Sequence, residues 1–199
     1  MGPMAKFFDS IHNTLVAGLV LVVAYVLITR GFSFDHNWFA FLFRWLHVLS
    51  AIMWIGLLYY FNFVQIPSMP KIPDEQKPAV SKVIAPQALF WFRWAALATV
   101  ITGLILASMN GYIGPALALG IGSGVMKYTA IGIGMWLGLI MAFNVWFLIW
   151  PNQQKALGLV EADADTKKAA AATAKLFSRI NTMLSIPMIF AMVAAQNIF

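Results

Sequence analysis

Cysteine is absent from the 199 residues of this chain. Its absence excludes structural disulfides, thiolate-bound metal sites, iron–sulfur clusters and the C-x-x-C-H motif that attaches a c-type haem. Any metal bound by this chain must therefore be held by histidine, methionine or oxygen ligands. The chain has three histidines and eleven methionines, which are the first residues to consider for that role.

Charged residues are also scarce. They make up 10% of the chain against 61% hydrophobic residues, and the mean hydropathy is +0.80, whereas a soluble domain typically has about 25% charged residues. So few charges cannot cover a soluble fold of this length, but they suffice for the loops and helix ends of a bundle surrounded by lipid. The composition predicts an all-α integral membrane protein with one helical domain over residues 1–199.

Five apolar segments predict a bundle of about five transmembrane helices, because about 20 apolar residues span the hydrocarbon core. A polar loop rich in proline and lysine separates the second segment from the third, and a turn at 110–115 ends the third. Pro151 and Asn152 are expected to end the fourth segment. A solvated surface helix is expected at 161–174, and Pro187 would kink the last segment. The predicted spans are 15–28, 38–64, 89–109, 124–150 and 182–199.

Lysine and arginine collect in two loops, and the cytoplasmic side of a membrane protein accumulates these cations. The two loops fall on the same side of a five-span chain. The opposite side has Arg30 before the polar run 33–37, and no cation lies between Asn110 and Ser123. We therefore expect a cytoplasmic N-terminus and an outer C-terminus. The net charge of +6 follows from these loops, so nucleic acid is not expected as a partner. The residues expected on the cytoplasmic side are Lys6, Lys71, Lys77, Lys82, Lys155, Lys167, Lys168, Lys175 and Arg179.

Arg44 and His47 are polar residues within a predicted span, which makes them candidates for function. They are three residues apart and share one helix face, which Ser50, Ala51 and Trp54 continue. A neutral imidazole is the usual axial ligand of a b-type haem, and an arginine can pair with a haem propionate. Two interpretations remain open: His47 as the metal ligand of a haem with Arg44 on a propionate, or His47 in a structural hydrogen bond.

A second axial ligand would come from the outer ends of other spans, and spacing singles none out. The candidates are Met109, Met126, Met135 and Met192, with Lys127 or Tyr128 in a proton or anion role. His12 and His36 are expected to be solvated.

Other polar and small residues favour structural roles. Asn144, in the middle of a span, is expected to form a hydrogen bond between helices because a buried amide needs a partner. Arg93, between two tryptophans, is expected at the membrane interface. Small-xxx-small patterns at Gly120–Gly124 and Gly134–Gly138 indicate close helix approach, within the bundle or in an oligomer, with close approach to a cofactor as the alternative.

Four stretches occur in order along the chain: Phe43-Arg44-Trp45-Leu46-His47-Val48 with Trp54-Ile55-Gly56, Ala88-Leu89-Phe90-Trp91-Phe92-Arg93-Trp94-Ala95-Ala96, Asn144-Val145-Trp146 with Ile149-Trp150-Pro151-Asn152-Gln153, and Ser178-Arg179-Ile180-Asn181-Thr182. Together they resemble the membrane domain of the bacterial membrane-bound, cytochrome c-dependent urate oxidase (urate hydroxylase) family, in a short form without the cytochrome c domain. The resemblance carries over Arg44, His47, Arg93, Asn144 and Asn181.

The resemblance implies a protein of the bacterial inner membrane that oxidises urate to 5-hydroxyisourate and passes electrons through haem b to a cytochrome c or another redox subunit. Two other hypotheses stay open. The chain could be a non-catalytic structural or assembly subunit of a larger membrane complex. It could also be a small transporter, although no acidic residue lies within a predicted span and Pro187 is the one helix breaker in them.

Overall fold

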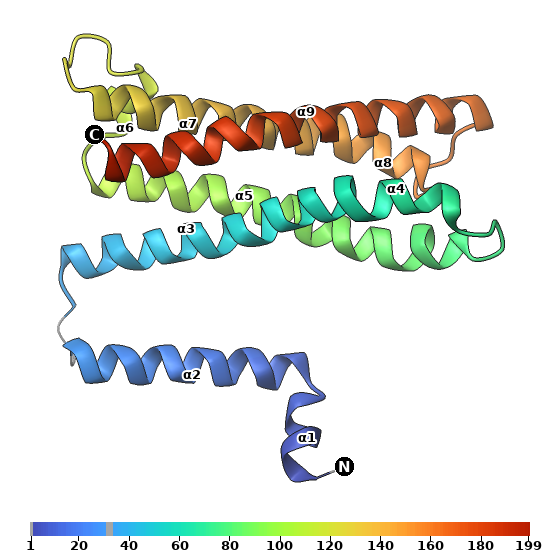
Figure 1. The fold of residues 1–199 in the computed structure, drawn as a ribbon, viewed down its shortest axis with the longest axis horizontal. Coiled ribbons are helices and arrows are strands. Elements are labelled where there is room, and N and C mark those ends of the chain that lie inside the picture. Colours follow the sequence, from blue (N-terminus) through green and yellow to red (C-terminus); the bar gives the residue numbers. More distant parts are fainter. Residues whose placement is uncertain (1, 31–33) are drawn as a thin grey trace. The chain divides into compact units, whose positions relative to one another are not determined.

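The computed structural model describes residues 2–30 and 34–199, and every regular element in these ranges is helical (Figure 1). Part of the predicted polar run at 33–37 lies outside the described residues, as does the side chain of Arg30. Among the described residues, five helices are long and apolar enough to cross a membrane, as predicted: Ile11–Thr29, His36–Lys71, Ala79–Met109, Met126–Ala156 and Ala164–Asn197. The chain divides into two compact units, Met1–Phe39 and Ala40–Phe199, and each is described by itself.

The first unit contains the short helix α1, Pro3–Phe8, and the long helix α2, Ile11–Arg30. The apolar window of α2 buries none of its residues within the protein. A helix that is apolar all round is typical of a membrane span or a buried helix. The first predicted span, 15–28, therefore begins about one turn too late.

The second span is longer than the predicted 38–64. Helix α3, His36–Tyr59, continues through the π-helical turn η1, Tyr60–Gln65, and the short segments α4, Ile66–Ser68, and η2, Met69–Lys71. The sequence predicted that a polar loop would follow residue 64, but the helix continues through Pro67 and Pro70 to Lys71. Each proline occupies the first turn of a new helical segment, where a missing N–H is tolerated.

The third span is also longer than the predicted 89–109. The π-helical turn η3, Ala79–Ile84, leads directly into α5, Ala85–Met109, so the connection between the two spans shrinks to residues 72–78. A turn follows α5 as predicted, with Gly111 at a φ of 71°. The short helix α6, Ile113–Leu117, then forms where the sequence suggested only a turn.

The fourth span does not end at Pro151. Helix α7, Met126–Phe143, continues through the π-helical turn η4, Asn144–Ile149, into α8, Trp150–Ala156. Pro151 lies in the first turn of α8, so the helix tolerates it for the same reason as above.

The fifth span is one helix of 34 residues, α9, Ala164–Asn197. The sequence predicted a separate surface helix at 161–174 and a span at 182–199, and this division is wrong. Asp163 begins the helix, because its Oδ1 accepts a hydrogen bond of 2.8 Å from the backbone N–H of Thr166. Pro187 lies inside α9 and does not interrupt it.

The glycines of the two small-xxx-small patterns behave differently. Gly120 and Gly124 lie in the loop before α7 with φ of 72° and 66°, so that pattern is not a helix face. Gly134 lies on α7, and a Cβ there would come within 3.2 Å of Met192 Cγ on α9. The expected close approach of helices thus occurs at Gly134, whereas a Cβ on Gly138 would meet nothing within 4 Å.

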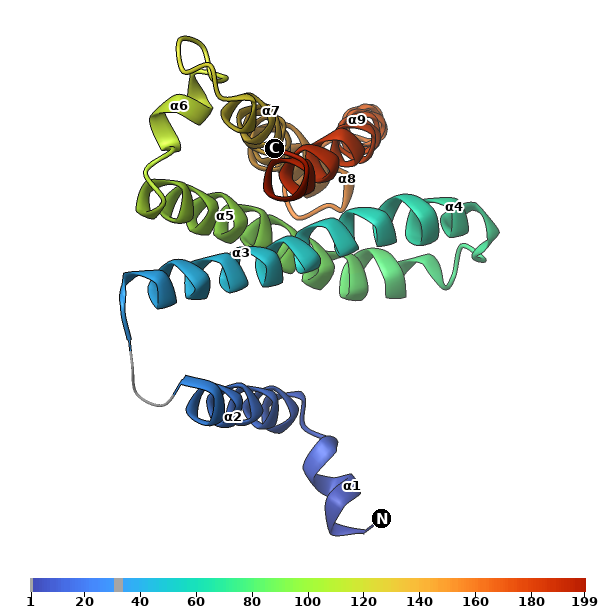
Figure 2. The ribbon, with the colours of Figure 1, turned by 60° about the vertical axis from the view of Figure 1, so that its left-hand side comes forward.

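The core of the second unit is formed by side chains from all its long helices. Figures 1 and 2 show α9 running back along α7 and α8. Helices α3 and α5 lie together on one side of these three helices. The largest side chains that are almost completely buried are Trp54, Leu58, Phe92, Met141, Val145, Asn181 and Ser185. The core therefore contains polar side chains as well as apolar ones.

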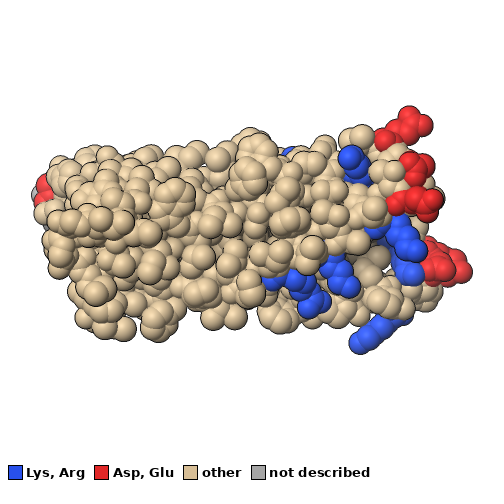
Figure 3. Space-filling model, turned by 90° about the horizontal axis from the view of Figure 1, so that it is seen from above, with Lys and Arg blue, Asp and Glu red and all other residues tan. Residues whose placement is uncertain are grey.

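Charged side chains gather at one end of the second unit (Figure 3). This end is formed by the 72–78 connection, the end of α8 and the start of α9, and Lys77 pairs there with Asp74 at 2.5 Å. The two cation-rich loops that the sequence predicted on one side do lie at one end of the bundle.

Candidate ligand-binding pocket

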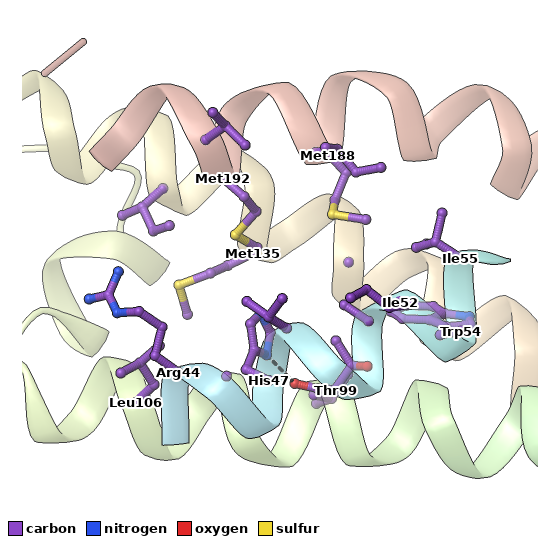
Figure 4. A pocket seen from close by; sticks show the side chains of 18 of the residues that line it. Arg44, His47, Ile52, Trp54, Ile55, Thr99, Leu106, Met135, Met188 and Met192 are labelled. Carbon is purple, nitrogen blue, oxygen red and sulfur yellow. Dashed lines mark hydrogen bonds between the residues drawn. The ribbon is translucent and has the colours of Figure 1, made fainter. Parts of the chain in front are cut away.

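A pocket of about 680 Å³ lies inside the second unit, between α3, α5, α7 and α9 (Figure 4). Its volume falls in the range of ligand-binding pockets, about 300–1,000 Å³. The wall is mostly apolar, as such pockets usually are. The side chains with polar atoms on it are Arg44, His47, Trp54, Tyr59, Thr99, Tyr112, Gln196 and Asn197. The sequence therefore identified two of the pocket's polar residues, Arg44 and His47, from the pattern of α3 alone.

The imidazole of His47 is fixed by α5. Its Nδ1 lies 2.8 Å from the backbone carbonyl oxygen of Thr99, 52 residues away in the chain. A carbonyl oxygen can only accept, so Nδ1 must carry the hydrogen. In the neutral imidazole this leaves a lone pair on Nε2. His47 is thus held in the tautomer that a metal ligand bound through Nε2 requires.

The lack of a side chain on Gly103 leaves space for the imidazole of His47. A Cβ on Gly103 would lie 2.8 Å from Cε1 and 3.0 Å from Nδ1 of His47, which is closer than carbon atoms pack. Gly103 is one helical turn after Thr99, so the same face of α5 supplies both the hydrogen bond and the space. Sequence reasoning missed both residues, because nothing in a single sequence indicates which turn of α5 faces His47.

Arg44 lies at the rim of the pocket, one turn before His47 and exposed. Tyr112, from the turn after α5, lies near it. Burial raises the pKa of the Tyr112 hydroxyl, and the positive charge of Arg44 acts in the opposite direction. A cation on an exposed rim beside an apolar cavity suits a ligand with an apolar body and an anionic group.

Three methionines face His47 across the pocket: Met135 on α7, and Met188 and Met192 on α9 (Figure 4). Of the predicted second ligands, Met135 and Met192 line the pocket, whereas Met109, Met126, Lys127 and Tyr128 are not part of its wall. Met188 was missed, although its position four residues before Met192 places the two on one helix face.

Asn144 and Asn181 lie outside the pocket and join two helices. Asn144 Nδ2 donates to Asn181 Oδ1 at 2.8 Å, and Asn181 Nδ2 donates to the carbonyl oxygen of Met141 at 3.0 Å. Both asparagines are buried. This is the hydrogen bond between helices that the sequence predicted for Asn144.

Arg93 is surrounded by aromatic rings rather than by pocket residues. Its guanidinium carbon lies 3.8 Å from the ring centroid of Trp150 and 5.6 Å from that of Phe90. The Nε1 of Trp146 donates to its backbone carbonyl at 3.2 Å. The cation–π contact with Trp150 therefore ties α5 to α8, and the hydrogen bond from Trp146 ties α5 to η4.

The pocket residues fit a haem. A backbone carbonyl behind the second ring nitrogen is the usual arrangement for a metal-bound histidine. The apolar wall suits a porphyrin ring, and Arg44 can pair with a propionate. The part of the chain that the structure describes has no cluster of three or more His, Asp or Glu side chains able to hold a metal ion. A metal on His47 would consequently need most of its ligands from a cofactor.

Comparison with known proteins adds one finding. Residues 123–197 match the family model described as urate oxidase N-terminal. The match covers α7, η4, α8 and the whole of α9, including Asn144, Asn181 and the three pocket methionines, and it begins after α3 and α5. Comparison with curated proteins and with solved structures gave no match. From the loop before α7 to the end of α9, this chain is therefore similar to the N-terminal region of urate oxidases, which supports a urate oxidase-related family.

Proposed function

We propose that this chain is a membrane-embedded b-type haem redox protein or subunit of the urate oxidase type, in the bacterial inner membrane. His47 would hold the haem iron, Arg44 would pair with a propionate, and one of the three pocket methionines would supply the second ligand. The proposed orientation places the N-terminus in the cytoplasm and the C-terminus outside.

One observation carries this proposal. The Nδ1–H of His47 is bonded to the Thr99 carbonyl, so Nε2 is free beside an apolar pocket large enough for a cofactor. A histidine with a purely structural role would be expected to pair Nε2 with a hydrogen-bond donor as well. His47 instead presents an unshared lone pair next to a cavity with a cation at its rim.

The family match supports urate as the substrate. Conversion of urate to 5-hydroxyisourate, with the new oxygen taken from water, releases two electrons and two protons. A bound haem supplies one-electron transfer, and a cytochrome c or another redox subunit accepts the electrons. The chain's own residues bind the cofactor, keep bulk water out through the apolar wall, and hold the imidazole in one tautomer.

The proposal is tested on protein purified in mild detergent, by a pyridine haemochrome assay and a dithionite-reduced minus oxidised spectrum. We expect a b-type signal near one haem per chain, and its loss in His47→Ala. His12→Ala is the matched control, because His12 is exposed on α2. Full haem content in His47→Ala would refute the assignment of the ligand.

The alternative is a non-catalytic subunit of a larger membrane complex. It is favoured by α2, which is apolar all round, as a helix surrounded by lipid or by other chains is. This alternative would be favoured if the native protein contains no haem and also gives no b-type spectrum after haemin is added.

A further inference from the structure

A group of buried polar side chains lies beside the pocket, where α9 meets the two π-helical turns η1 and η4. We name it the polar cluster; its members are Asn62, Asn144, Ser178, Asn181 and Ser185, each between 0% and 6% exposed. Burying such groups is costly unless each is hydrogen-bonded. Each amide and hydroxyl group of the cluster therefore needs a hydrogen-bond partner.

Asn62 is the member whose bonding is incomplete. Its Nδ2 donates to the carbonyl oxygen of Leu58 at 2.9 Å and to Ser178 Oγ at 2.7 Å. Its Oδ1 is buried and has no hydrogen-bond partner among the described residues. Exchanging the amide nitrogen and oxygen would not remove the problem, because the Leu58 carbonyl can only accept and must face the nitrogen.

Two further buried atoms without a described partner lie on the same continuous helix. They are Gln65 Oε1 on η1, three residues after Asn62, and Trp54 Nε1 on α3. An unpaired buried polar atom costs about 1–3 kcal/mol, and native proteins usually satisfy such atoms with ordered water. Two of these atoms are acceptors and one is a donor, a mixture that water can satisfy because it both donates and accepts.

The cluster is connected to the pocket through Tyr59. The Tyr59 hydroxyl lies 3.0 Å from Ser185 Oγ, and Ser185 donates its own hydrogen to the carbonyl oxygen of Thr182 at 2.7 Å. Tyr59 therefore donates to Ser185, and Tyr59 also lines the pocket. On α9 the residues Ser178, Asn181 and Ser185 share the face that Met188 and Met192 continue toward the pocket.

We infer that the polar cluster is an internal hydration site, with water bound at Asn62 Oδ1, that leads from Tyr59 at the pocket toward the charged end of the bundle. Neutral water is the occupant because the cluster has no carboxylate to balance a cation. Its role rests on the proposed function: hydroxylation with water consumes one water and releases two protons, and an apolar pocket needs a polar route for both.

Hydration is tested on the purified full chain, with and without added haem, so the result does not depend on haem binding. A structure of the wild type at a resolution that shows ordered water should contain density within hydrogen-bond distance of Asn62 Oδ1. Radiolytic hydroxyl labelling in H₂¹⁸O should modify Phe61, which is buried and does not line the pocket. Asn62→Leu should lower this labelling several-fold without changing that of the pocket residue Met188.

The matched control is Asn152→Leu, because Asn152 makes the same type of bond, from Nδ2 to the carbonyl four residues earlier, on α8. Absence of density beside Asn62 in the wild type, or equal labelling in Asn62→Leu and wild type, would overturn the hydration site. If Asn62→Leu does not fold, the wild-type density decides. The proposed role of the polar cluster as a route for water and protons is tested separately. It is overturned if Asn62→Leu binds haem normally and its urate-dependent haem reduction keeps the wild-type rate and solvent isotope effect.

Discussion

The imidazole of His47 depends on a single turn of α5 for its orientation. Thr99 gives it a hydrogen-bond acceptor and Gly103 gives it room, and the two are four residues apart on one helix face. A cofactor ligand held in this way loses little freedom on binding, because its tautomer and ring plane are already set.

Gly103→Ala should therefore weaken haem binding. The added Cβ would lie 2.8 Å from Cε1 of His47, so the ring must move or the helices must separate. Changes to groups that orient a metal ligand typically cost about 10–100-fold in affinity. Titration of haemin into apoprotein, followed by absorbance, measures the loss. Gly56→Ala is the control, because a Cβ there meets nothing within 4 Å although Gly56 also lines the pocket.

Arg44→Gln should reduce haem affinity without abolishing the axial ligand. The lost charge-assisted contact to a propionate is worth about 1.5–3 kcal/mol when shielded from water, so we expect roughly tenfold weaker binding at this exposed rim. The absorption spectrum of the bound haem should keep its b-type form. Haem esterified at both propionates should bind wild type and Arg44→Gln equally; a persisting difference would contradict the pairing.

For single residues, the sequence predicted which side chains share one face of a helix. It did not predict which residues of other helices contact that face. The spacing of Arg44 and His47 was enough to place both on one face, and both line the pocket. Thr99 and Gly103 were missed because their role depends on the contact between α3 and α5, which no local pattern encodes. The same holds for Met188, whose importance appears only once α9 is placed across the pocket.

A pair of buried amides joins two helices of this bundle. The bond between Asn144 and Asn181 connects the end of α7 to the middle of α9. Asn144→Leu should lower the free energy of unfolding by about 1–3 kcal/mol, because Asn181 Oδ1 is left buried without its donor. Unfolding of the wild type and of Asn144→Leu in detergent with increasing SDS measures the difference in the free energy of unfolding. Asn110→Leu, an exposed asparagine bonded only within its own helix end, should change stability much less.

The N-terminus of α9 should be sensitive to acid. The side-chain and backbone hydrogen bonds of Thr166 lower the pKa of the Asp163 carboxyl below its ordinary value. Because the folded pKa is the lower one, this stabilisation is complete above the unfolded pKa and is lost as the pH falls through the folded value. Amide exchange in the first turn of α9 should therefore accelerate in this acidic range, after correction for intrinsic rates. Asp163→Asn should remove most of the pH dependence.

The number of spans followed from the sequence, but their ends did not. Pro67, Pro70, Pro86 and Pro151 all look like helix breakers in a linear reading. In the structure each lies in the first turn of a new helical segment that continues the previous one, three of them directly after a π-helical turn. A π turn depends on packing between helices, so sequence periodicity alone gave spans that were too short.

For the molecule as a whole, the absence of cysteine makes orientation directly measurable. Lys77→Cys and Lys168→Cys at the charged end should react with a membrane-impermeant maleimide only after spheroplasts are opened. Ile121→Cys, in the exposed loop before α7, should react in intact spheroplasts. The reverse pattern would contradict a cytoplasmic location of the cation-rich loops.

The length of α9 bears on where this protein meets its substrate. With a rise of 1.5 Å per residue, the pocket residue Met192 is about 42 Å from the start of the helix, at the charged end of the bundle, and only about 8 Å from its last residue. In the orientation we propose, the Met192 end of the cavity lies near the outer end of the bundle, and Tyr59 lies toward its cytoplasmic end. Substrate and electron acceptor would both approach from the periplasm, so the reaction would draw on solutes outside the cell while any proton passing along the polar cluster would cross toward the inside.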